Sequence, residues 1–125
     1  IKGHLRLRGG LAISVFQPDP NYPSGVLKLH HAVKVPESGA ELVRYHQESH
    51  DYAKQLIDVH YIYVITENGI SRTIVTDFRL RILLRGELEL LLDKAGFEVI
   101  DVFGSLEKEP HDITSKSIIA LAEKR

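Results

Sequence analysis

The sequence has no cysteine, no methionine and no tryptophan. Without cysteine, the chain cannot form disulfides, zinc–thiolate sites or a cysteine nucleophile. Translated chains begin with methionine, which is usually removed only before a small residue, whereas this one begins Ile1-Lys2. We therefore expect it to be part of a longer protein. An expression or structural boundary at Ile1 is the alternative, and the sequence leaves both open.

Neither an excess of one charge nor a long apolar run is present. With 16 Lys and Arg against 17 Asp and Glu, the net charge is −1, which argues against nucleic acid as a partner. The longest apolar runs, such as 118–122, are far shorter than the roughly 20 residues that span a bilayer. No signal peptide or lipidation motif opens the chain, so we expect no membrane partner and a cytoplasmic location. The 125 residues, 43% apolar, predict one folded unit of ordinary size.

The first part of the chain has the pattern of an α/β protein. Residues 11–16 are almost continuously apolar, which predicts a strand covered on both faces. Residues 17–25 hold three of the five prolines and predict a stiff loop. We assign 1–25 to the same domain as 81–125.

Residues 26–80 alternate apolar and polar side chains, as antiparallel strands do. We expect a β-meander with strands near 27–35, 41–51, 56–66 and 70–80. Asn68-Gly69 favours a two-residue hairpin turn, because both positions need positive φ. With Glu67 opposite Ile70, the register sorts one mainly apolar face from a polar one that carries the pair His60 and Asp77.

The last part predicts a helix, a strand, a charged connection and a second covered strand. One helix face is expected to carry Leu88, Leu91, Leu92 and Ala95, and Gly96 is placed to end the helix in a left-handed conformation. Strands are expected at 97–103 and 117–122. No internal repeat interrupts this order.

Three segments resemble the C-terminal half of class I S-adenosylmethionine (SAM)-dependent methyltransferases. Residues 8–15, Arg-Gly-Gly followed by an apolar run, look like the turn and fifth strand of that fold, with Arg8 where proline is usual. Residues 88–99, a leucine-rich helix ending in Ala-Gly-Phe, are similar to the helix and sixth strand. Residues 117–124 fit the seventh strand, which in that family runs antiparallel between the fifth and sixth. The resemblance implies a Rossmann-like α/β sheet, or an α+β unit in isolation, with an antiparallel insertion at 26–80.

The resemblance implies a methyltransferase acting on a small molecule, with SAM as the cofactor of the intact protein. The glycine-rich loop and the acidic strand end that hold SAM in this family are absent here, because Gly9-Gly10 precedes a strand and opens no helix. We therefore expect no cofactor-binding residue and no catalysis by this chain alone. The insertion would cover the acceptor.

Histidine and tyrosine concentrate in and just before the insertion, and either can accept or position an acceptor proton. Tyr22, His31, Tyr45 and His46 are the candidate acceptor contacts, with His31 or His46 as the possible base. His46 and His50, four residues apart, lie roughly 13 Å apart on a strand, too far to share a metal ion.

Other histidines and tyrosines of the insertion have a purely structural interpretation. Tyr61 and Tyr63 are equally explained as packing residues of a strand, and His60 opposite Asp77 as a surface pair. The rival hypothesis is a free-standing α+β module that binds a small apolar ligand or a second copy of itself. The unpaired edge of the strand at 11–16 predicts a homo-oligomer, such as a dimer with exchanged strands.

Overall fold

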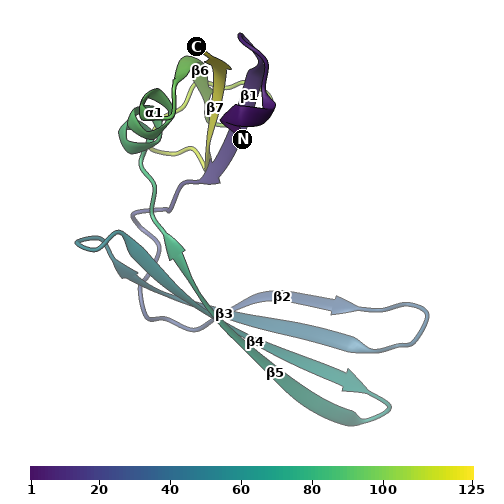
Figure 1. The fold of residues 1–125 in the computed structure, drawn as a ribbon. Coiled ribbons are helices and arrows are strands. Elements are labelled where there is room, and N and C mark those ends of the chain that lie inside the picture. Colours follow the sequence, from purple (N-terminus) through teal and green to yellow (C-terminus); the bar gives the residue numbers. More distant parts are fainter. The chain divides into compact units, whose positions relative to one another are not determined.

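The computed structural model describes all 125 residues, which divide into two compact units. Ile1–Asn21 and Leu83–Arg125 form the first unit, and Tyr22–Ile82 form the second. Each unit has its own sheet (Figure 1). The single α-helix has 10 residues, and no helix has the length and apolar character needed to cross a membrane.

The first unit is a three-stranded sheet with one helix. It contains a 3₁₀ turn (Lys2–His4), β1 (Gly10–Phe16), α1 (Arg85–Lys94), β6 (Phe97–Phe103) and β7 (Ser117–Lys124). The strand order is β1-β7-β6, and both pairings are antiparallel (Figure 1). The final strand therefore lies between the other two, as the resemblance implies.

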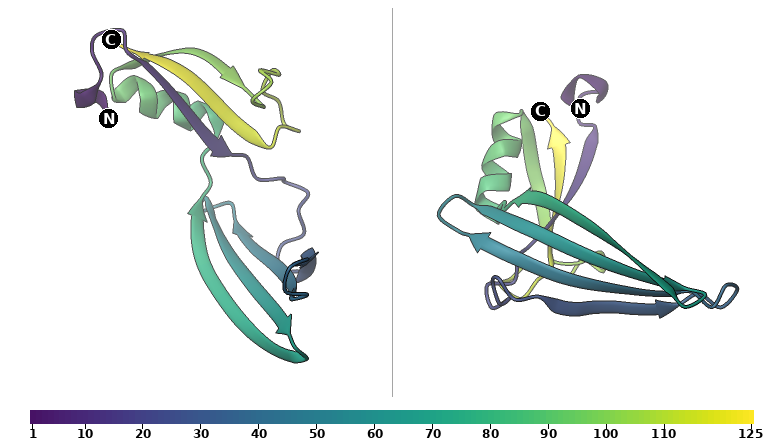
Figure 2. Two further views of the ribbon diagram at one scale, coloured as in Figure 1. Left: turned by 90° about the vertical axis from the view of Figure 1, so that its right-hand side faces the viewer. Right: turned by 90° about the horizontal axis from the view of Figure 1, so that it is seen from below.

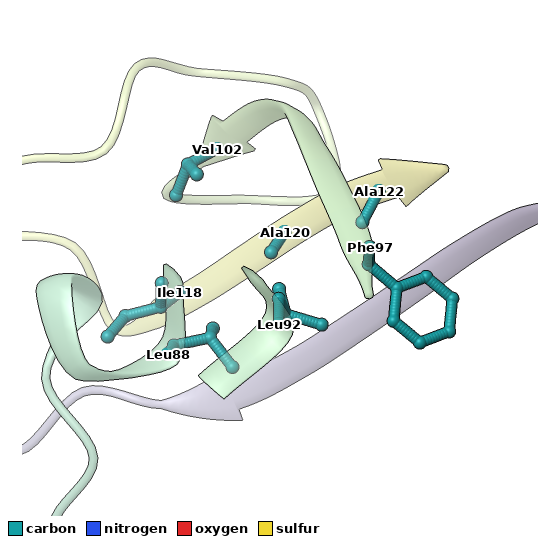
Figure 3. Packing of buried hydrophobic residues seen from close by; sticks show 7 residues of the cluster. All are labelled: Leu88, Leu92, Phe97, Val102, Ile118, Ala120 and Ala122. Atoms are coloured by element: carbon teal, nitrogen blue, oxygen red, sulfur yellow. The ribbon is translucent and has the colours of Figure 1, made fainter. Parts of the chain in front are cut away.

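The core of this unit lies between α1 and one face of the sheet (Figure 2). Figure 3 shows Leu88 and Leu92 of α1 beside Ile118 and Ala120 of β7, with Phe97 at the start of β6. Residues three to four apart share a helix face, so the leucine spacing buries this side of α1. Full burial of one such side chain contributes about 1.5–3 kcal/mol.

The expectation that β1 is covered on both faces is wrong. Its residues alternate between half-buried and exposed, and Phe16 is 39% exposed. Leu11, Ile13 and Val15 pack against the core under α1. β1 is an edge strand, and α1 is the only α-helix of the unit, so the other face of β1 has no cover.

The helix ends where the sequence predicts. Gly96 follows it with φ of +81°, and its amide donates to the Asp93 carbonyl at 2.8 Å. Only glycine adopts this conformation without steric cost. The helix starts at Arg85, whose guanidinium Nε lies 2.9 Å from Glu89.

The second unit is a four-stranded antiparallel sheet with the order β2-β3-β4-β5. Its long, twisted strands are β2 (Lys28–Lys34), β3 (Glu41–Asp51), β4 (Leu56–Glu67) and β5 (Ile70–Arg81) (Figure 2). These bounds lie within one residue of the predicted ones. Ile57, Val59 and Ile82 form its small buried core.

The predicted register of the β4–β5 hairpin is confirmed. Glu67 pairs with Ile70, and His60 pairs with Asp77. Asn68 and Gly69 have φ of +52° and +75°, as the two central positions of this turn require. Turn chemistry and apolar alternation select the same pairing, because a one-residue slip would reverse every side chain.

Candidate functional site

One face of β3 collects ionisable side chains, because alternate residues of a strand point to the same side. Arg44, His46, Glu48 and His50 stand in succession on this side, which we call the histidine face. Their cross-strand partners on β4 are, in the same order, Tyr63, Tyr61, Val59 and Ile57. The pairing therefore sets aromatic rings beside the first two residues and buried aliphatic side chains beside the last two.

The loop before β2 covers part of the histidine face. The Gly25 amide donates to the Glu48 carbonyl at 2.6 Å, and the His50 amide donates to Ser24 Oγ at 2.9 Å. These bonds fix the loop along β3. They place the ring of Tyr22 5.8 Å from the ring of His46 and 6.1 Å from that of His50.

His46 is the buried centre of this arrangement, with 7% of its surface exposed. The Tyr61 ring meets it edge-on at 4.9 Å, and the His30 ring lies at 5.2 Å. Its Nε2 is 2.9 Å from Glu48 Oε1, close enough for an ion pair, but neither ring nitrogen makes a well-aligned hydrogen bond. Buried polar groups are nearly always hydrogen-bonded, so an imidazole in this state is a candidate for binding or catalysis.

Burial also lowers the pKa of His46. The positive charges of His30, when protonated, and Arg44 lower this pKa further, while Glu48 opposes the shift. Desolvation penalises the charged imidazolium, and it is the largest of these effects. His46 is therefore neutral at pH 7 and able to accept a proton.

Glu48 lies between two histidines. Its Oε2 is 2.7 Å from Nε2 of His50, whose side chain is only 2% exposed. The other ring nitrogen of His50, Nδ1, is 3.4 Å from the hydroxyl of Tyr52. The same carboxylate, after burial itself, contributes to a raised pKa of Tyr22, which keeps that hydroxyl protonated.

Two cations already occupy the aromatic faces of the site. Lys28 Nζ lies 5.4 Å from the centre of the Tyr22 ring, and Arg44 Cζ lies 4.8 Å from that of Tyr61. Arg44 Nη2 also donates to His30 Nδ1 at 2.6 Å. A further ammonium ion would meet like charges here, so the histidine face suits a neutral or anionic molecule better than a cation.

The structure brings together two of the four residues proposed from the sequence, Tyr22 and His46. It places Tyr45 on the opposite face of β3, where it pairs with Ile62. His31 pairs with Arg44 at the edge of the histidine face, where it is exposed and makes none of the ring contacts with His46.

The ring that reaches His46 belongs instead to His30. The register of β2 against β3 shifts between Leu29 and His31, so His30 is the additional residue of a bulge. Nothing in the local sequence marks this bulge. The places of Glu48 and His50, in contrast, follow from the alternation along 44–50, because every second residue of a strand points to the same side. No group of three or more metal-ligating residues that could hold an ion is present.

The opposite face of the sheet carries a shallow groove of about 550 Å³. Its polar side chains satisfy one another: His60 pairs with Asp77, as predicted, and Arg79 Nε donates to Asp58 Oδ1 at 2.6 Å. That salt bridge lowers the pKa of Asp58. This groove therefore offers less unsatisfied chemistry than the histidine face.

Comparison with known proteins identifies the fold. No family model and no curated protein matches the sequence. Among solved structures, a SAM-dependent methyltransferase from Clostridium acetobutylicum matches with a TM-score of 0.80 at 9% identity, over 98% of this chain and 47% of that one. The CcbJ methyltransferase from Streptomyces caelestis matches with a TM-score of 0.70 at 21% identity, over 99% of this chain and 50% of that one. CalS10, an amino pentose methyltransferase from Micromonospora echinaspora, matches with a TM-score of 0.72 at 17% identity, over 99% of this chain and 47% of that one.

The chain thus spans about half the length of each of these methyltransferases. At these identities the likeness is one of fold. The resemblance to the C-terminal half of class I methyltransferases, drawn above from three short segments, is confirmed at that level, as is the mixed α/β class.

Proposed function

We propose that this chain is the acceptor-binding C-terminal half of a SAM-dependent methyltransferase that acts on a small molecule. The methyltransferase fold supports the reaction class. The observation that carries the acceptor-binding role is His46, a buried, neutral imidazole with no well-aligned hydrogen bond, under the ring of Tyr22. The cytoplasmic location expected from the sequence stays a prediction.

The residues present do not fit SAM. In open α/β sheets a nucleotide lies at the carboxyl ends of parallel strands, where a glycine-rich turn opens a helix. Here Gly9 precedes β1 and Gly10 is its first residue, so they open a strand and not a helix, and the Gly9 amide donates to the Arg6 carbonyl at 2.9 Å. β1 is followed by a loop and not by a helix, and its one sheet neighbour, β7, runs antiparallel to it. The donor site therefore has to come from other sequence.

The chemistry assigned to this chain is removal of a proton from the acceptor. A hydroxyl becomes a good nucleophile as its proton is removed, whereas a neutral amine already has a free electron pair and loses its proton as the new bond forms. A neutral His46 accepts that proton, and the Tyr22 ring excludes water from the imidazole. The positive charges of Lys28 and Arg44 favour an acceptor that arrives without a positive charge of its own. CalS10 is an amino pentose methyltransferase, and here we propose a small polar acceptor that presents a hydroxyl or an unprotonated amine.

Calorimetry first tests the proposal that the SAM site lies outside this chain. We expect no heat of SAM binding to these 125 residues, and tight binding would overturn the claim that the donor site lies elsewhere. The second test measures methyl transfer from labelled SAM to an amino pentose and to its hydroxyl counterpart, using a longer protein that joins this chain to a SAM-binding half.

His46→Asn should reduce kcat/KM in that assay by roughly 10²- to 10⁴-fold, the usual contribution of general base catalysis. His60→Asn, on the opposite face of the sheet, is the matched control and should leave transfer unchanged. Equal activity of the two variants would refute the role of His46.

A further inference from the structure

We infer that Glu48 and His50 are positioning residues for His46, and that they leave Nδ1 of His46 as the nitrogen that takes the acceptor's proton. This inference rests on the proposed function. It names one atom as the base and assigns a role to two further side chains of β3, Glu48 and His50.

The direction of the hydrogen bonds follows from the carboxylate. An ionised carboxylate only accepts, so each imidazole nitrogen facing Glu48 must present an N–H. At His50 this nitrogen is Nε2, 2.7 Å from Glu48 Oε2, and Nδ1 is then free to accept from the Tyr52 hydroxyl at 3.4 Å. At His46 it is Nε2, 2.9 Å from Glu48 Oε1. Nδ1 of His46 therefore carries a lone pair and has no partner.

Burial and backbone contacts hold the row of three side chains, His46, Glu48 and His50, in place. The side chains of His46, Glu48 and His50 are 9%, 20% and 2% exposed. The loop before β2 bonds to the backbone at both Glu48 and His50. Only Tyr52, at the outer end, is open to solvent, with 51% exposed. The carboxylate is thus fixed by His50 before any acceptor arrives.

The contact between His46 and Glu48 is the one poorly aligned link. Catalytic hydrogen bonds are often badly aligned without substrate and improve when it binds. When the acceptor gives up its proton, its N–H or O–H bond breaks, the electron pair stays on the acceptor, and an Nδ1–H bond forms on His46. The resulting imidazolium then faces Glu48 through Nε2–H, so the carboxylate stabilises the charged form as it develops.

Several other groups face His46 and bear on its titration. His30, Arg44 and Lys28 are basic, and Tyr22 and Tyr61 are phenols. Glu48 is the carboxylate that raises the pKa of His46, against the lowering effects of burial, His30 and Arg44. Its removal should therefore lower the pKa of His46 further.

The test that needs no activity is nitrogen-15 NMR of the histidine rings in the 125-residue chain. We expect His46 to be protonated on Nε2 and unprotonated on Nδ1 at pH 7.5. Glu48→Gln should abolish this preference and lower the pKa of His46, whereas Glu48→Asp should retain both. Glu41→Gln, an exposed change at the other end of β3, is the control. A protonated Nδ1 in the unaltered chain would overturn the inference.

Kinetic measurements in the longer methyltransferase distinguish a positioning role of Glu48 from a purely structural one. Glu48→Gln should lower kcat by roughly 10-fold or more with little change in KM, and it should move the acidic limb of the pH profile to lower pH. Glu48→Asp should recover most of the rate. An active enzyme whose acidic limb ignores Glu48→Gln overturns the inference but leaves the proposed function standing. An unaltered enzyme with no transfer overturns the proposed function and the base role, while the NMR result still decides the tautomer.

Discussion

The ring of Tyr22 lies 5.8 Å from the ring of His46, with 35° between their planes, and it closes the histidine face from the side of the loop before β2. In the sequence, the whole of β2 and the connection from β2 to β3 separate Tyr22 from His46. Their proximity depends on the bonds of Ser24 and Gly25 to β3. Tyr22 therefore controls how strongly His46 is desolvated.

Removing this ring should change how His46 titrates. Burial is the largest cause of its lowered pKa, so Tyr22→Ala should admit water and raise the pKa toward the ordinary value near 6.5. Tyr22→Phe keeps the ring and should leave the pKa of His46 low. NMR titration of the His46 ring protons measures both. The explanation by desolvation fails if the alanine variant titrates like the unaltered chain.

The stability of the second unit should depend on pH through His46. Because its pKa is lower in the folded chain, the unfolded chain binds more protons below about pH 6.5, and stability falls as the pH decreases toward the folded pKa. Urea unfolding at pH 7.5 and 5.5 should show the unaltered chain losing more stability than His46→Asn. Parallel losses in the two proteins would contradict the assigned pKa direction.

Two glycines near α1 should respond oppositely to alanine. Gly96 has φ of +81°, and a Cβ there would also meet the Lys2 side chain, so Gly96→Ala should destabilise the first unit by about 1–2 kcal/mol. Gly86 lies within the helix with open space around it, so Gly86→Ala should stabilise by about 0.5–1 kcal/mol. Thermal unfolding of the two variants gives both signs. A stabilising effect at Gly96 would remove the capping argument.

Local signals predicted much of the fold, because they and the tertiary contacts favour the same structure. Asn68-Gly69 set the hairpin register, and Gly96 set the helix end. The exposed face of β1 was missed because apolarity alone cannot reveal which neighbours are present. At the site, His46 and Tyr22 were found from residue type, whereas His30 depended on a bulge that leaves no mark in sequence. The alternation along β3 places Glu48 and His50 on the same side of the strand. Their burial, in contrast, depends on the loop before β2, which the local sequence of β3 does not reveal.

The free edge of β1 leads to a prediction about association. β1 pairs only with β7, and its seven residues, Gly-Leu-Ala-Ile-Ser-Val-Phe, contain neither a charge nor a proline. Natural edge strands usually carry such residues, because a bare edge offers unpaired amides and carbonyls to another strand. We expect the 125-residue chain to form homo-oligomers through this edge, detected by light scattering as a mass that rises with concentration. Ser14→Lys should weaken the association, while Ile113→Lys, at an exposed position of the β6–β7 connection, should not. A monomer at every concentration would show that the edge is protected in some other way.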